Sequence, residues 1–148
     1  MNIIQINDAD KAQYMDLLLL ADEHENMINK YLKRGKMYAY YQDDLKTIAV
    51  VTDEKNGTFE IKNIATIPQY QKMGYGKKMI DYLAATYKPL GTTLLVGTGD
   101  CPSTITFYQK CGFTYSHTLK NFFLDNYDHP MWDDGKQLTD MIYLKKTL

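Results

Sequence analysis

The clearest pattern of apolar and polar residues runs from residue 57 to residue 87. Up to residue 67, apolar and polar side chains alternate, as in a strand with one buried face. The apolar set is Phe59, Ile61, Ala65 and Ile67, and the polar set is Glu60, Lys62 and Thr66. Pro68 has no N–H to donate, so it ends the strand. From residue 76 the spacing becomes helical, and the apolar face is Gly76, Ile80, Leu83, Ala84 and Tyr87.

The residues before this stretch predict a strand, two helices and a hairpin. Residues 2–7 form the first strand, and Asp8 or Asp10 caps the helix after it through a side-chain oxygen. A second helix is expected from about residue 23 to residue 34, where Gly35 ends it. Residues 36–42 and 45–52 are expected to form a hairpin, and a second hairpin turn is expected at residues 56–57.

The residues after the central helix predict three more strands and one helix. Residues 92–96 form a short apolar strand, and residues 97–102 are expected to form a loop. Pro102 suits the first turn of a helix, which Gly112 ends. Residues 113–119 and 141–145 are the last two strand candidates. No regular element is predicted for residues 121–135.

Composition narrows the class of protein. The chain has 148 residues, of which 45% are hydrophobic and 24% charged, so we expect one globular domain over residues 1–148. A net charge of −1 argues against a nucleic-acid partner, which requires a basic face. The aliphatic run at residues 17–20 is too short to cross a membrane. The charged start of the chain is unlike an export signal, so a cytoplasmic location is expected.

The two cysteines and three histidines do not indicate a metal site. Cys101 and Cys111 lack the spacing of metal ligands, and two cysteines do not make a disulfide framework. Free thiols suit a reducing compartment. His24, His117 and His129 are scattered along the chain, so no metal is expected.

The turn between the central strand and its helix has the features of an anion site. Gly74 and Gly76 allow close approach of a ligand, and the first N–H groups of a helix have no internal partner. The helix dipole and the three lysines nearby, Lys72, Lys77 and Lys78, favour a phosphate or pyrophosphate. The third glycine of a dinucleotide fingerprint is absent, and no Gly-Lys-Ser/Thr follows as in a P-loop.

Two motifs of the chain, one in this turn and one further on, resemble those of the GNAT acetyltransferase superfamily. Residues 71–76, Gln-Lys-Met-Gly-Tyr-Gly, are similar to its Gln/Arg-x-x-Gly-x-Gly/Ala signature. Residues 108–113, which begin with Tyr108 and end with Gly112-Phe113, are similar to its Tyr-x-x-x-Gly-Phe segment. The resemblance covers essentially the whole chain. It implies an α/β (α+β) fold with a mixed, mostly antiparallel sheet of about six to seven strands and about four flanking helices.

The resemblance also implies acetyl-CoA as co-substrate and assigns its binding residues. The pyrophosphate would lie on the turn formed by Gln71, Lys72, Met73, Gly74, Tyr75, Gly76 and Lys77. The pantetheine arm would bond backbone groups of the central strand at Ile64, Ala65 and Thr66. A splayed opening between this strand and residues 92–96 would admit the thioester. Relatives often have an asparagine in the following loop, where this chain has Asp100, Cys101 and Pro102.

Tyr108 is the predicted catalytic acid. The resemblance places the matching tyrosine close to the CoA sulfur, and a phenol with a pKa of about 10 can protonate a thiolate whose pKa is about 8.5. The alternative is that Tyr108 is one of 13 tyrosines packed in the core. The general base is less clear, because Asn63 stands where many relatives have a glutamate. Glu60 is a weak candidate that faces the other side of a regular strand unless a bulge intervenes, and a water chain is another.

The predicted function is therefore transfer of an acetyl group from acetyl-CoA to a primary amine by direct attack in a ternary complex. The alternative is a non-catalytic acyl-CoA sensor or regulatory module. The acceptor would be a small molecule or a peptide amine. Two segments are acidic: residues 8–25 contain six acids and one basic residue, Lys11, and residues 121–140 contain five acids and one basic residue, Lys136. These acids favour a cationic acceptor, or they serve only to solvate the surface. The oligomeric state is left open by the sequence, and a homodimer is one alternative.

Overall fold

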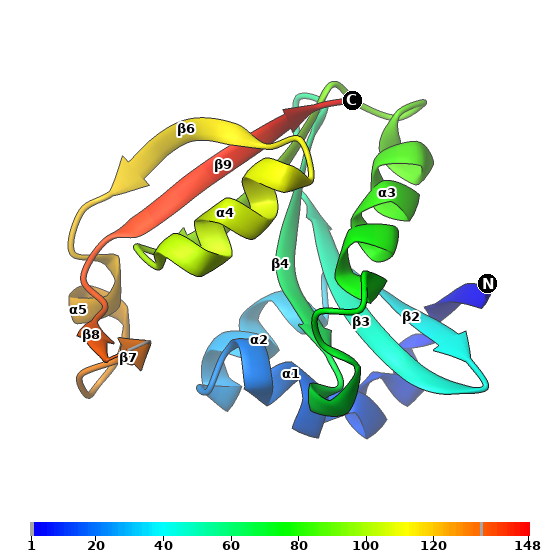
Figure 1. The fold of residues 1–148 in the computed structure, drawn as a ribbon, viewed down its shortest axis with the longest axis horizontal. Coiled ribbons are helices and arrows are strands. Elements are labelled where there is room, and N and C mark those ends of the chain that lie inside the picture. The colour runs from blue at the N-terminus through cyan, green and yellow to red at the C-terminus, as the bar shows by residue number, and fades with distance from the viewer. Residues whose placement is uncertain (1, 134) are drawn as a thin grey trace.

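The computed structural model describes residues 2–133 and 135–148 and contains one large sheet with helices on both faces (Figure 1). The strands of the large sheet are β1 (Asn2–Ile6), β2 (Lys36–Gln42), β3 (Asp44–Asp53), β4 (Thr58–Thr66), β5 (Thr93–Gly99), β6 (Thr114–Leu119) and β9 (Met141–Thr147). The α-helices are α1 (Met15–Ala21), α2 (Glu25–Leu32), α3 (Tyr75–Tyr87), α4 (Pro102–Lys110) and α5 (Phe122–Asn126). Short 3-10 helices η1 and η2 cover Asp8–Tyr14 and Pro68–Tyr70.

The sheet order is β1-β2-β3-β4-β5-β9-β6, and β4 with β5 is the parallel pair among antiparallel neighbours. The hairpin turns fall where the sequence predicts them. Asp43, Asn56 and Gly57 have positive φ angles of 70°, 56° and 78°, which Asp, Asn and Gly tolerate best. The mixed, mostly antiparallel sheet flanked by helices confirms the predicted fold class.

Two apolar clusters hold the layers together on opposite faces of the sheet. The first joins α3 and α4 to the strands and includes Ile80, Leu83 and Tyr108. The second joins α1 and α2 to the strands and includes Leu18, Ile28 and Ile48. The helical spacing of the apolar residues explains this division, because each helix buries one face. No helix among residues 2–133 and 135–148 combines the length and the apolar character needed to cross a membrane.

The two halves of the sheet separate beyond the middle of β4. Pairing between β4 and β5 covers only Thr58–Ile61 against Thr93–Val96, after which β5 continues along β9. In Figure 1, β9 and β6 turn away from β4, and α4 lies against them. The prediction that residues 97–102 form a loop is therefore wrong for Gly97, Thr98 and Gly99, because antiparallel pairing with β9 extends the strand.

The N-terminal helix also differs from the prediction. Neither Asp8 nor Asp10 caps it: the N-cap residue of η1 is Asn7, which makes no side-chain cap hydrogen bond. Asp8 instead pairs with Lys11 at 2.8 Å, and the Lys11 ammonium donates to the carbonyls of Leu32 and Gly35. Lys11, which precedes α1 in the chain, therefore contacts the C-terminal end of α2.

The region from residue 121 to 135 contains more regular structure than the sequence suggested. It holds α5 and β7 (Trp132–Asp133), and β7 pairs with β8 (Lys136–Gln137) in a small second sheet. These elements are too short to produce a readable period of apolar residues. Asp134, one of the acids counted in this region, lies outside the described residues.

Candidate active site

The turn between β4 and α3 is shaped by two residues in the left-handed region. Lys72 has φ 63° and Gly74, the N-cap of α3, has φ 92°. A Cβ on Gly74 would meet nothing within 4 Å, so this position is open to the outside of the turn. No side chain caps α3. The first N–H groups of this helix are thus available to an anion, in the region where the helix dipole is positive.

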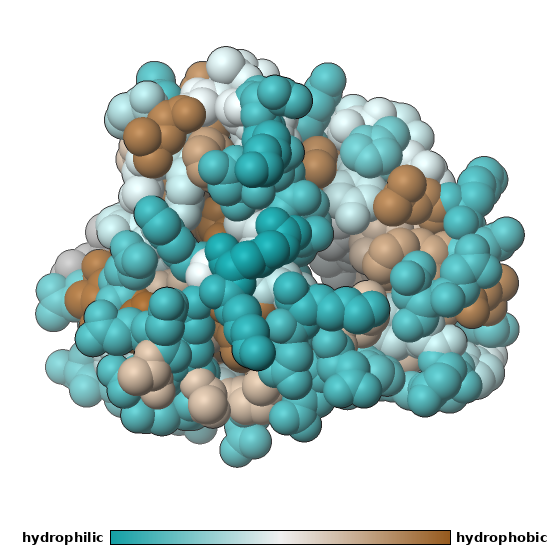
Figure 2. All heavy atoms as spheres, turned by 180° about the vertical axis from the view of Figure 1, so that it is seen from behind, coloured by the Kyte–Doolittle hydropathy of each residue, from teal (hydrophilic) through white to brown (hydrophobic). Residues whose placement is uncertain are grey.

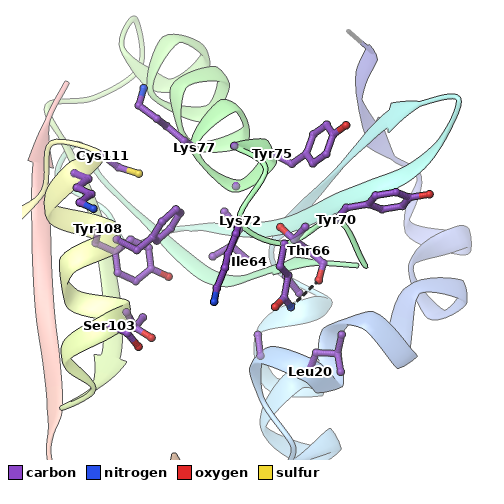
Figure 3. Close-up of a pocket in the computed structure, with 18 residues that line it drawn as sticks. Leu20, Ile64, Thr66, Tyr70, Lys72, Tyr75, Lys77, Ser103, Tyr108 and Cys111 are labelled. Atoms are coloured by element: carbon purple, nitrogen blue, oxygen red, sulfur yellow. Dashed lines mark hydrogen bonds between the residues drawn. The ribbon is translucent and has the colours of Figure 1, made fainter. Parts of the chain in front are cut away.

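A cavity of about 600 Å³ lies beside this turn and is called here the first cavity. Figure 3 shows its lining, with Tyr108 and Ser103 on α4 at one side and Thr66, Lys72 and Tyr75 at the other. The lining residues are Leu20, Ala21, Ile64, Ala65, Thr66, Tyr70, Gln71, Lys72, Gly74, Tyr75, Gly76, Lys77, Ser103, Thr104, Phe107, Tyr108, Lys110 and Cys111. The cavity therefore opens between β4, the start of α3 and α4.

The first cavity brings together most of the residues predicted to bind the co-substrate. Every one of them lines it except Met73, whose side chain is exposed. The Gln71 amide donates to the Thr66 carbonyl at 3.2 Å and so fixes the turn against the end of β4. Lys77 pairs with Asp81 at 3.0 Å, which raises the pKa of its ammonium. Lys72 makes no ion pair with a described residue, so its charge is available to a ligand.

Tyr108 projects from α4 into the first cavity. It is buried, with 6% of its surface exposed, and this burial raises the pKa of its phenol well above the usual value. The hydroxyl therefore stays protonated throughout the physiological pH range and is available as a donor. Its ring packs against Phe107 and Phe113 at centroid distances of 5.2 and 5.6 Å, which hold its orientation.

Several residues that line the first cavity were not predicted from the sequence. Leu20 and Ala21 come from the end of α1, and Ser103 and Cys111 come from the two ends of α4. Burial raises the pKa of the Cys111 thiol, so it remains neutral at neutral pH. Cys111 follows Tyr108 by three residues, so helical spacing could have indicated that the two share a face; the contributions of Ser103 and of α1 depend on tertiary packing.

A second cavity of about 360 Å³ lies on the side of α2 and α5. It is lined by Asp22, Met27, Lys30, Tyr31, Arg34, Glu60, Ile61, Lys62, Gly97, Phe122, Asn126, Tyr127, Met141 and Tyr143. Gly97 belongs to the part of β5 that has left β4, so the separation of the two strands forms part of this cavity.

Glu60 lines the second cavity and not the first. A bulge in β4 lets Val50 pair with Asn63 and Val51 pair with Ile61, so the register skips one residue. Glu60 is buried and pairs with Lys62 at 3.0 Å, while burial raises the pKa of its carboxyl. Asn63, also buried, donates to the Leu18 carbonyl and to the Tyr31 hydroxyl, both at 3.0 Å.

Only one of the described acids in the two acidic segments lines the second cavity, and that is Asp22. Others are paired elsewhere: Glu23 and Asp128 with His129, and Asp140 with Lys120. Within the described part of the chain, no group of three or more His, Cys, Asp or Glu side chains is arranged to hold a metal ion.

Comparisons with known proteins find acetyltransferases, both by family model and by sequence. A family model described as an acetyltransferase (GNAT) domain matches residues 33–115. The uncharacterized N-acetyltransferase YvbK of Bacillus subtilis (strain 168) is 35% identical over 144 residues, which cover 95% of this chain and 93% of that protein.

Three solved structures of acetyltransferases are similar to this structure over nearly the full length of the chain. An IAA acetyltransferase from Bacillus cereus has a TM-score of 0.92 and 33% identity, covering 99% of both chains. A GNAT family acetyltransferase from Elizabethkingia anophelis with acetyl-CoA bound has a TM-score of 0.93 and 35% identity, covering 99% of this chain and 97% of that one. A Bacillus subtilis acetyltransferase in complex with CoA has a TM-score of 0.88 and 34% identity, covering 99% and 98%.

Proposed function

This chain belongs to the GNAT acetyltransferase family and is an acetyl-CoA-dependent acyltransferase; from that premise we propose that it acetylates a primary amine by direct attack in a ternary complex. The observation that carries the proposal is the first cavity, which joins an open helix N-terminus to β4 and to a buried tyrosine. The free acceptor is cationic, because an aliphatic amine is mostly protonated at neutral pH.

The donor is proposed to lie along the first cavity. Its pyrophosphate takes the N–H groups of the Gln71–Lys77 turn, with Lys72 as an unpaired cation beside it. Its pantetheine arm follows Ile64, Ala65 and Thr66, which line the cavity on β4. Gly74 and Gly76 leave room for this approach, since neither has a side chain. Two structures of similar proteins contain acetyl-CoA or CoA, which supports this choice of ligand.

Tyr108 is proposed as the acid that protonates the departing thiolate. Attack of the amine on the thioester carbon gives a tetrahedral intermediate, and its collapse breaks the C–S bond. Burial raises the pKa of the phenol, but a thiolate released into the same buried cavity is raised in basicity as well. The phenol is nevertheless a weaker acid than the thiol, so this proton transfer is uphill when taken alone; it is completed because the C–S bond breaks in the same step and the acylated nitrogen returns a proton to the phenolate.

The amine must lose a proton before it attacks, and Glu60 is the acceptor suggested by the sequence. It lies in the second cavity, where the bulge in β4 puts it on the side of α2. Its partner Lys62 stabilises the charged carboxylate but also competes with a bound ammonium. Glu60 is therefore a weak candidate for the base, although burial raises the pKa of its carboxyl, and the amide of Asn63 cannot take that role.

A thiol-release assay over a panel of primary amines tests the proposal. Purified protein is mixed with acetyl-CoA and each amine, and CoA affinity is measured in parallel by calorimetry. We expect CoA binding together with thiol release that depends on one class of amine. CoA binding without thiol release for any amine would contradict acetylation of a primary amine.

A further inference from the structure

The two cavities meet along one wall. On β4, Ile64 lines the first cavity and Lys62 lines the second, with Asn63 between them. At the end of α1, Ala21 lines the first cavity and the next residue, Asp22, lines the second. Two separate segments thus pass from the lining of one cavity to the lining of the other within one or two residues. A group bound in the second cavity near this wall lies next to the end of the first.

Two buried polar atoms at or beside this wall lack partners. Among the described residues, the buried side-chain atoms without a hydrogen bond are Asn63 Oδ1 and His24 Nδ1. Asn63 already uses its amide group toward Leu18 and Tyr31, so its carbonyl oxygen alone is left over. Buried polar atoms are nearly always satisfied, and a ligand N–H or a water at this position would complete the set.

Asp22 has one carboxylate oxygen engaged and one open. Its Oδ1 accepts hydrogen bonds from the Tyr127 hydroxyl at 3.0 Å and from the His24 backbone N–H at 3.2 Å. Its Oδ2 has no partner among the described residues, and no described Lys, Arg or His pairs with the carboxylate. Glu60, by contrast, has its Oε2 paired with Lys62. Asp22 is therefore the carboxylate of the second cavity that is oriented but not neutralised.

We propose that the second cavity binds the acceptor amine and that Asp22 Oδ2 holds its ammonium group and takes its proton. This inference rests on the proposed acetyl transfer and names the base for it. The rest of the acceptor would be an apolar or aromatic body, because the remaining lining is rich in such side chains. They are Met27, Tyr31, Ile61, Phe122, Tyr127, Met141 and Tyr143.

The ammonium gives one proton to Asp22 Oδ2, and the freed nitrogen lone pair forms the C–N bond to the thioester carbon. The C–S bond breaks, and the sulfur takes the Tyr108 proton. The nitrogen then loses its second proton, which restores Tyr108, and Asp22 releases its own to water. The products are an N-acetylated amine, CoA thiol and one proton.

Burial of Asp22 supports this role. It raises the pKa of the carboxyl, while the hydrogen bonds from the His24 backbone and Tyr127 lower it. A base with a raised pKa holds the proton better after transfer. The titratable and charged groups that face Asp22 from neighbouring elements or share its cavity are Glu23, His24, Lys30, Tyr31, Arg34, Glu60, Lys62, Tyr127 and Tyr143.

The test compares Asp22→Asn with the matched variant Glu60→Gln, both isosteric changes of a carboxylate in the same cavity. For an amine found in the panel, we expect Asp22→Asn to lower kcat/KM about a hundredfold or more at neutral pH, with the deficit narrowing as the pH approaches the pKa of the amine. CoA affinity should not change. Glu60→Gln should lose much less. Near-normal activity of Asp22→Asn, or a larger loss in Glu60→Gln, overturns the inference.

A second variant keeps the test informative if Asp22→Asn folds poorly. Tyr127→Phe removes one of the two hydrogen bonds that lower the Asp22 pKa, so the acidic limb of the kcat/KM profile should move to higher pH while activity at alkaline pH is retained. An unmoved limb contradicts the role of Asp22. A result with these variants that contradicts the role of Asp22 does not contradict the proposed acetyl transfer. A wild-type protein that binds CoA but acetylates no amine overturns both the proposed function and this inference.

Discussion

At the scale of single residues, burial rather than a charged partner sets the character of Tyr108. Its phenol lies in an apolar environment between α4 and the first cavity, which disfavours the phenolate. The motif in the sequence was enough to single out this residue. Asp22 could not be found in the same way, since its role depends on Tyr127, more than a hundred residues away in the chain, and on the border between two cavities.

Replacing Tyr108 with Phe tests the acid directly. We expect kcat to fall about a hundredfold or more, because a general acid typically contributes that much, while CoA affinity stays unchanged. Tyr87→Phe is the matched control: it removes a buried hydroxyl from the same apolar cluster, where Tyr87 bonds Tyr38 at 2.8 Å away from the first cavity. A loss below about threefold in Tyr108→Phe would point to water as the proton donor.

Lys11 is a buried charge that stabilises the fold and not the site. Its ammonium donates to the carbonyls of Leu32 and Gly35 at 2.8 and 2.6 Å, where α2 ends and the helix dipole is negative. Lys11→Met should therefore lower the free energy of unfolding by about 2 to 4 kcal/mol, because both carbonyls lose a charged donor.

Denaturant unfolding of Lys11→Met beside wild type measures this loss. Lys33→Met, which alters an exposed lysine close to the end of α2, is the control and should be nearly neutral. An unchanged midpoint in Lys11→Met would mean that water satisfies the two carbonyls.

At the scale of elements, β4, the turn and α3 form the unit on which the donor site depends. The sequence predicted all three, because their periods of 2 and 3.6 are long enough to read and Pro68 and Gly74 mark the ends. The bulge in β4 was raised only as an open alternative. Nothing local at residues 60–63 specifies it; the pairing with β3 and the contacts of Asn63 with α1 and α2 do so.

Gly74→Val tests the turn as an anion site. Valine at a positive φ costs about 1 to 2 kcal/mol of stability, and its side chain would stand where the pyrophosphate is expected. Gly135→Val is the matched control, since Gly135 also has a positive φ, 74°, and open space around it but lines neither cavity.

Calorimetry with CoA and thermal melting of both variants separate the two effects. Both should lose a similar amount of stability, and only Gly74→Val should lose CoA affinity. Equal CoA affinity in the two variants would remove the turn from the binding site.

At the scale of the whole molecule, the separation of β5 from β4 lets Gly97 line the second cavity, while the first cavity opens between β4, the start of α3 and α4. Sequence reasoning anticipated this opening from the family resemblance, but it could not foresee the second cavity, which needs α5 from the irregular region and Gly97 from the longer β5. Seen from behind, the surface is mainly hydrophilic and its hydrophobic residues lie in separate groups (Figure 2).

The acidic segments at residues 8–25 and 121–140 make a prediction about encounter rate. If their field attracts cations, kcat/KM for a polyamine should fall with added salt more steeply than for a monoamine of similar size, because at 0.1 M salt the interaction between exposed charges more than about 10 Å apart is largely screened. Measuring both amines at low and high salt decides this. Equal slopes would mean that these acids only solvate the surface, as the pairing of Glu23, Asp128 and Asp140 suggests for part of the set.

The most direct test of the central claim is a crystal structure of the protein with CoA bound. The account predicts the pyrophosphate on the N–H groups of the turn before α3, the pantetheine arm along β4, and the sulfur within hydrogen-bonding reach of the Tyr108 hydroxyl, close to Asn63. Density for the pyrophosphate elsewhere, or a sulfur far from both Tyr108 and the wall between the cavities, would contradict it.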